Sequence, residues 1–192
     1  MKPNLTFIIL LITTSVMSSC AYKLSTNIES LPGGVRHIYI PLFKNTTIEP
    51  GAEVVFTNAL TNEALRSRVT KIENSEANAE AVLQGSVAVI AVLADESVLE
   101  AVNDIYLPGE TVLATQYHVT VTVDLVLKKK GSNAILWSGT FTQSKSFTAA
   151  QITLPVINTS NSLYNESAKR QTLDALSKEM MQAGFDRMIE NF

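Results

Sequence analysis

The chain has 192 residues, of which 46% are hydrophobic and 17% are charged, and its formal net charge at pH 7 is −3. Because there is no basic excess, the composition argues against general nucleic-acid binding. The length fits one compact domain that buries a sizeable apolar core, with room for a short targeting segment.

The first residues have the pattern of a secretion signal. Lys2 supplies a positive start, residues 5–16 are largely apolar, and two small serines follow. As a helix, the apolar stretch would span only about 18 Å, which is well short of the roughly 30 Å hydrocarbon core of a membrane. The pattern therefore favours a cleaved signal peptide, residues 1–19, over a spanning anchor.

Cys20 is the only cysteine of the chain, so an internal disulfide is excluded. A solitary cysteine in a secreted protein pairs between molecules, remains a free thiol or is modified. The stretch Met17-Ser18-Ser19-Cys20 resembles the lipobox of bacterial lipoproteins, with Met17 in place of the usual Leu. The resemblance implies cleavage before Cys20 and covalent attachment of a diacylglycerol and an N-acyl chain. Several acyl chains hold a protein at a membrane, whereas one binds only marginally.

The residue after the cysteine bears on which membrane carries the anchor. In lipoproteins of bacteria with two membranes, Asp at this position tends to retain the protein at the inner membrane. Ala21 stands there in this chain, so the resemblance implies the periplasmic face of the outer membrane. No second apolar run approaches the length of a membrane helix, and we expect residues 20–192 to form a single water-soluble domain.

The first half of this domain alternates between strand and helix patterns. Residues 35–40 (VRHIYI) are rich in β-branched and aromatic side chains, which predicts a strand. Residues 41–51 (PLFKNTTIEPG) form a loop whose mixture of Pro, Asn, Phe and Gly is unusually specific for a plain connector. Apolar residues then recur at helical spacing from Val55 to Ala64, and residues 82–92 predict a second, mostly apolar strand.

The second half predicts two more strands and a longer helix. Residues 117–128 alternate apolar and polar side chains in the cleanest period-two pattern of the chain. A turn at 128–133 leads to a strand at 135–147. After a polar loop at 151–163, a helix that carries an apolar stripe is predicted from Asn165 onward. The order predicts an α+β fold: a two-layer sandwich with a four-stranded sheet, either mixed or mostly antiparallel, and two helices packed on one face.

The sequence has no motif that groups side chains suited to catalysis or metal binding. His37 and His118 have no His, Cys, Asp or Glu at ligand spacing in the same predicted strand. Neither a G-x-S-x-G nor a phosphate-binding G-x-x-x-x-G-K-[ST] motif is present. We therefore expect no enzymatic activity, no metal site and no cofactor apart from the acyl groups on Cys20.

The predicted hairpin tip is the first candidate contact site. Lys128, Lys129 and Lys130 follow one another there. Such a charge run is either a solvated tip or a site for the phosphates or carboxylates of a glycolipid. The lysines could equally contact acidic groups of a partner protein.

The long connection between residues 94 and 115 is the second candidate. It contains Ile105, Tyr106 and Leu107 in the stretch DIYLPGE. A connection of this length is either disordered or a partner-binding loop, in which case these three side chains are its apolar anchors.

Several stretches, taken together and in order, resemble the lipopolysaccharide-assembly lipoproteins of the LptE family. They are CAYKL, IPLFKNTTIEPG, YHVTVTVDLVLKKK, ILWSGTF and the C-terminal ESAKRQTLDALSKEMMQAGFDRMIENF. The resemblance implies a small α/β sandwich that sits as a plug in the LptD β-barrel and helps deliver lipopolysaccharide to the outer leaflet. It also implies lipopolysaccharide binding through basic residues without assigning them, so Lys128–Lys130 rest on local charge alone. The competing hypothesis is a structural envelope lipoprotein that contacts peptidoglycan or another outer-membrane complex.

Overall fold

The computed structural model describes residues 30–94, 98–100, 112–114, 116–148, 151–154, 157–160 and 162–190. The leader, Cys20 and the stretch Ile105–Leu107 lie outside these residues. The described elements are, in chain order, η1 (Pro32–Gly34), β1 (His37–Tyr39), β2 (Lys44–Asn45), α2 (Ala52–Ser67), β3 (Lys71–Ile72), η2 (Glu76–Asn78), β4 (Ala81–Ala94), β5 (Val98–Glu100), β6 (Val112–Ala114), β7 (Gln116–Lys129), β8 (Ile135–Thr148), β9 (Gln151–Leu154), β10 (Ile157–Ser160) and α3 (Ser162–Glu190).

The main sheet has six strands in the order β3-β1-β4-β7-β8, with β2 also paired to β4. β4, β7 and β8 are antiparallel neighbours, whereas β1 runs parallel to β3 and β4, and β2 runs parallel to β4. The prediction of four strands is therefore wrong in number, and of the two predicted alternatives the sheet is the mixed one. β2 and β3 have two residues each, too few for an alternating pattern to show in the sequence.

Two short hairpins accompany the main sheet. β5 pairs with β6, and β9 pairs with β10, both antiparallel. They occupy the connections 94–115 and 151–163, where the sequence predicted only loops. Strands of three or four residues give too little periodicity to identify from the sequence.

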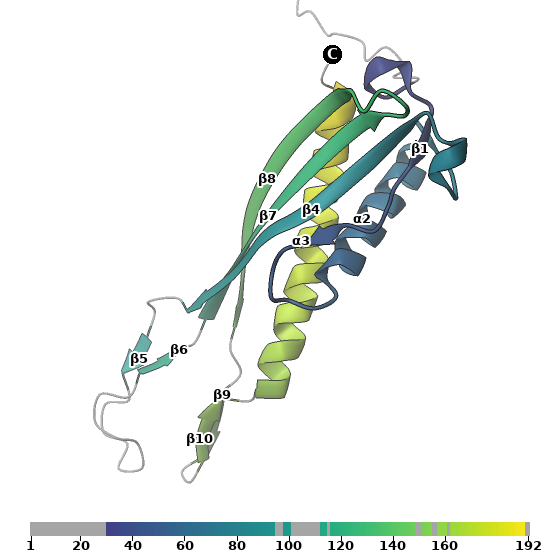
Figure 1. Ribbon diagram of the computed structural model, residues 1–192. Helices are drawn as coiled ribbons and strands as arrows, with labels where there is room; N and C mark the ends of the chain where they lie inside the picture. The colour runs from purple at the N-terminus through teal and green to yellow at the C-terminus, as the bar shows by residue number, and fades with distance from the viewer. Residues whose placement is uncertain are drawn as a thin grey trace, which may run out of the picture.

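Helices α2 and α3 cover one face of the main sheet, as predicted (Figure 1). The alternation of β7 explains this arrangement, because successive side chains of a strand point to opposite faces. Its apolar set lies under the helices without solvent exposure: Val119, Val121, Val123, Leu125 and Leu127.

Both helices bury the apolar stripes that their spacing predicts. In α2 the buried residues include Phe56, Leu60 and Ala64. In α3 they include Met180 and Phe185, and the helix begins at Ser162, three residues before the predicted start. Most of the stability of such helices comes from packing this face against the sheet. Neither α2 nor α3, the two α-helices in the described part of the chain, is long and apolar enough to span a membrane.

Along β7 and β8 the opposite face of the sheet is largely polar, and no described helix covers it. Hydroxyl groups of β7 and β8 meet across this face in pairs: Thr120 with Ser144 at 3.1 Å, Thr122 with Thr142 at 3.0 Å, and Thr140 with the carboxylate of Asp124 at 2.6 Å. Such cross-strand pairs stabilise the sheet modestly and leave a face suited to water or to a polar partner.

Candidate functional site

The lysine run lies at a hairpin tip, as predicted. The backbone N–H of Lys129 donates to the carbonyl of Ala134 at 2.8 Å, and that of Asn133 donates to the carbonyl of Lys129 at 3.0 Å. Gly131 takes a positive φ of 82°, which glycine adopts without strain. The β7–β8 hairpin therefore places three consecutive lysines at one end of the sheet.

The three ammonium groups are not equivalent. The Lys130 side chain donates a hydrogen bond to the backbone carbonyl of Ala77, beside η2, and its backbone N–H donates to the carbonyl of Glu80 at 3.0 Å. By contrast, no hydrogen bond or ion pair joins the side chains of Lys128 and Lys129 to other described residues. These two lysines are the ones available to an anionic ligand.

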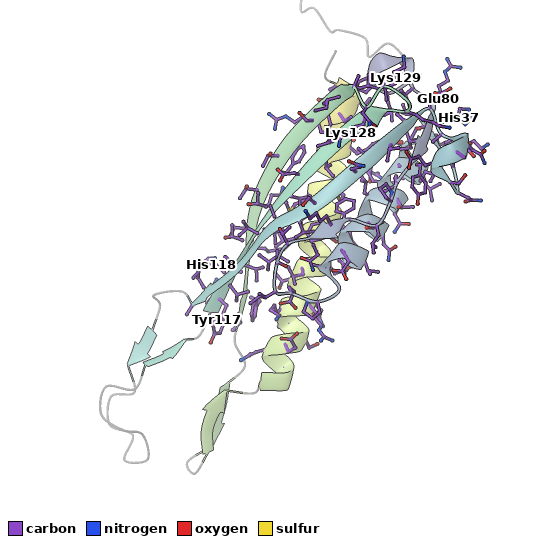
Figure 2. All side chains as sticks on the ribbon, in the orientation of Figure 1. His37, Glu80, Tyr117, His118, Lys128 and Lys129 are labelled. Carbon is purple, nitrogen blue, oxygen red and sulfur yellow. The ribbon has the colours of Figure 1, made fainter. Side chains whose placement is uncertain are left out.

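Glu80 lies at the same end of the molecule as Lys128 and Lys129 (Figure 2). Its Oε2 accepts hydrogen bonds from the backbone N–H groups of Arg36 at 2.8 Å and His37 at 3.3 Å. These bonds favour the carboxylate and lower the pKa of Glu80 below its usual value. Glu80 is thus an anion that holds the start of β1.

A second carboxylate, Glu73, is shared between the side chains of His37 and Lys71. Its Oε1 lies 2.8 Å from Nδ1 of His37 and 3.1 Å from Nζ of Lys71. The hydrogen bond with His37, followed by that with Lys71, lowers the pKa of Glu73. Carboxylates held in the ionised form accept hydrogen bonds and attract cations. This end of the molecule therefore presents hydrogen-bonded ionic groups beside the lysine tip.

The loop 41–51 proves to be part of the folded structure. The Phe43 ring is buried in the core, and the backbone N–H of Phe43 donates to Thr57 at 3.0 Å. The Asn45 amide donates at 2.8 Å both to the Glu49 carbonyl and to the Glu53 carboxylate. The unusual composition of this loop is thus explained by its role in joining β2 to α2.

A concavity of about 400 Å³ lies beside this loop on the open face of the sheet. The segment Pro41–Lys44 forms one wall, and residues of β4 and β7, including Ser86 and Asp124, form the floor. This hollow has no signature in the sequence because it depends on the pairing of β2 with β4, which is not local in the chain. It holds both a cation, Lys44, and an anion, Asp124, and so does not favour an anionic ligand.

The remaining predicted site residues are not tested by the structure. Cys20 and the apolar triplet Ile105, Tyr106 and Leu107 lie outside the described residues. Within the described ranges, no three His, Cys, Asp or Glu side chains are placed to hold a metal ion. His118 is far from His37, at the other end of the sheet, next to Tyr117 (Figure 2).

Comparison with known protein families shows which family the chain belongs to. The model of the lipopolysaccharide-assembly family LptE matches residues 35–191. The chain belongs to the LptE family. This confirms the family predicted from the sequence, and the LptE family is a non-enzymatic family of lipopolysaccharide-assembly lipoproteins.

Several solved structures are similar to the chain at low sequence identity. A Helicobacter pylori protein, provisionally assigned as a neuraminyllactose-binding hemagglutinin homologue, has 15% identity and a TM-score of 0.51, with 83% of this LptE-family chain and 88% of that chain covered. PelC from Paraburkholderia phytofirmans, a dodecamer, has 16% identity and a TM-score of 0.46, covering 80% and 87%. A minor lipoprotein from Acinetobacter baumannii has 14% identity and a TM-score of 0.42, covering 82% and 92%. No curated protein sequence matches the chain.

Proposed function

We propose that this LptE-family chain is an outer-membrane lipoprotein of the lipopolysaccharide transport machinery. In this role it is the plug and assembly partner of an LptD-type β-barrel and helps deliver lipopolysaccharide to the outer leaflet. The observation that carries the proposal is the family match, which spans all of the described main sheet and both helices. The sandwich is compatible with it because it presents ionic groups at the lysine tip and a polar face along β7 and β8.

The lipid anchor of the proposal rests on Cys20. Its position after an apolar leader, and the absence of any other cysteine, suit covalent lipidation. Intact mass measurement of the mature amino terminus tests this directly. We expect a chain that starts at residue 20 and carries a diacylglycerol thioether and an N-acyl chain. A free thiol, or a start at another residue, contradicts the anchor.

We assign the contact with lipopolysaccharide to Lys128 and Lys129. Phosphate and carboxylate groups accept short, charge-assisted hydrogen bonds from ammonium groups, and these two side chains have no partner among the described residues. Lys130 contributes less in this scheme because its ammonium group is bound to Ala77. Ile105, Tyr106 and Leu107 remain our candidate apolar contacts with the barrel.

Binding of purified lipopolysaccharide tests the lysine site. The double variant Lys128→Ala/Lys129→Ala should lose about tenfold or more in affinity, with its circular dichroism unchanged. Lys130→Ala should lose less. The control is Lys178→Ala, which removes an exposed lysine from α3, where it pairs with Asp174. Unchanged affinity in the double variant would exclude this site.

A further inference from the structure

One side of β4 is left without a neighbouring strand along its second half. On this side β1 pairs with Ala81 and Val82, and β2 pairs with Ser86 and Val87. Thr46 then ends the pairing, because its hydroxyl donates to the carbonyl of Ala88 at 3.2 Å. No described strand follows along residues 89–94 on this side, whereas β7 continues along the other. The backbone groups on this edge are therefore available to another strand.

The exposed side chains of this edge are apolar. Val89, Val92 and Leu93 expose 47%, 39% and 65% of their surfaces. No charged residue occurs between Ala81 and Ala94. Figure 1 shows this end of β4 continuing beyond α2, so that helix leaves it uncovered.

Natural proteins usually protect such an edge with charge, proline or a bulge. β4 has a bulge between Val87 and Val89, but it lies before the free stretch. From Val89 to Ala94 the strand pairs regularly with β7 and presents an apolar edge. An edge of this kind is a template for strand addition.

The sequence of the edge identifies its partner. Residues 89–93 read Val-Ile-Ala-Val-Leu, so antiparallel pairing of the stretch with itself about Ala91 sets Ala against Ala and the larger aliphatic side chains against one another. A two-fold interface requires this kind of self-complementarity, since each residue meets its counterpart from the other copy. A lipid head group does not fit, because the stretch has no cation, and an acyl chain would leave the backbone groups without hydrogen-bond partners.

We propose that two copies of this chain associate through antiparallel pairing of residues 89–93, with the two-fold axis at Ala91. Val89 then lies opposite the second copy's Leu93 on the open face, and Ile90 lies opposite the second copy's Val92 on the helix face. Aliphatic and β-branched pairs of this kind stabilise antiparallel strands. The lysine tip takes no part, so the interface is independent of the proposed contact with lipopolysaccharide.

Mass measurement during size-exclusion chromatography tests the association. The sample is the chain from residue 20 to residue 192 with Cys20→Ala, which retains every residue that the structure describes. We expect a dimer fraction that rises with protein concentration. Val89→Lys/Leu93→Lys should weaken dimerisation by about tenfold or more, because it brings ammonium groups into opposition across the pair. Leu65→Lys, at a residue of α2 that is 58% exposed, is the matched control and should dimerise normally.

Disulfide trapping provides a second readout that does not depend on the lysine variants. Directly opposed residues of antiparallel strands have Cα atoms about 4.5–5.5 Å apart, which is within disulfide reach. In the Cys20→Ala background, Ala91→Cys should therefore form a covalent dimer under mild oxidation. Ala77→Cys, at an exposed alanine in η2, is the control and should crosslink more slowly. A monomer at every concentration, with Ala91→Cys crosslinking no faster than Ala77→Cys, overturns the proposal.

Discussion

At the scale of single residues, Gly85 provides the space in which the Phe43 ring is buried. A Cβ atom placed on Gly85 would lie 2.2 to 2.4 Å from three ring atoms of Phe43, closer than any van der Waals contact allows. The two residues are neighbours only because β4 is paired with β2. The sequence showed the glycine within a predicted strand but not the ring that requires it.

Gly85→Ala should destabilise the protein by about 1–3 kcal/mol through overpacking. Equilibrium unfolding in urea measures the change. Ser86→Ala, at the next position and facing the opposite side of the strand, is the control and should have a much smaller effect. Adding Phe43→Leu to Gly85→Ala should relieve part of the clash. If Gly85→Ala is as stable as the parent chain, the packing of Phe43 described here is incorrect.

Glu80 predicts a pH dependence of stability. Its pKa is lowered by hydrogen bonds from the backbone N–H groups of Arg36 and His37. A carboxylate with a lowered folded pKa stabilises the protein above the unfolded pKa, near 4.5, and loses this effect as the pH falls through the folded pKa. Glu80→Gln should therefore lower the melting temperature at pH 7, and the difference from the parent should shrink below about pH 4.5.

Thermal unfolding followed by circular dichroism from pH 7 to pH 3 measures this difference. Glu76→Gln removes a negative charge from the same end of the molecule without removing hydrogen bonds to β1, and it serves as the control. A difference between Glu80→Gln and the parent that is constant over this range would contradict the assigned role.

At the scale of elements, the long strands and both helices could be predicted because their side-chain periodicity is local. The alternation in β7 and the stripe in α3 are confirmed as buried faces. β2 and β3 could not be predicted, because their existence depends on pairing with strands elsewhere in the chain. The parallel direction of β1 has no signature in a strand of three residues.

An ionic contact joins the start of α2 to α3. Removing this contact tests how much it contributes to holding the two helices together. Nζ of Lys169 lies 2.9 Å from both Glu49, just before α2, and Glu166 on α3. Burial alone would lower the pKa of Lys169, but hydrogen bonds to Glu49 and Glu166 outweigh it, and the pKa is raised. Lys169 is 19% exposed, so solvent screens this contact less than an exposed pair.

Lys169→Ala should destabilise the protein by about 1–2 kcal/mol, because it leaves the half-buried Glu49 without its partner. Lys178→Ala removes an ion pair on the same helix in which the lysine is 67% exposed, and it should change stability by less than about 0.5 kcal/mol. Urea denaturation of both variants measures the contrast. Equal effects would mean that the contact between Lys169 and Glu49 does not hold the helices.

At the scale of the whole molecule, the sheet separates two regions of different character. One end carries the lysine tip with Glu80 and His37 (Figure 2), and the second half of β4 presents an apolar edge. The tip was predictable because its three lysines are consecutive and a glycine follows. The restraint of Lys130 by Ala77 was not, because those residues are 53 positions apart. The proposed barrel partner came from family resemblance and not from periodicity or charge.

The partnership with a barrel is the central claim, and co-purification from the outer membrane tests it most directly. The full chain, tagged at its C-terminus and expressed in its own host, should be purified in mild detergent and its bound proteins identified by mass. We expect an LptD-type β-barrel in roughly stoichiometric amount, together with lipopolysaccharide. Recovery of peptidoglycan or another envelope complex in its place, or of the chain alone, would contradict the account.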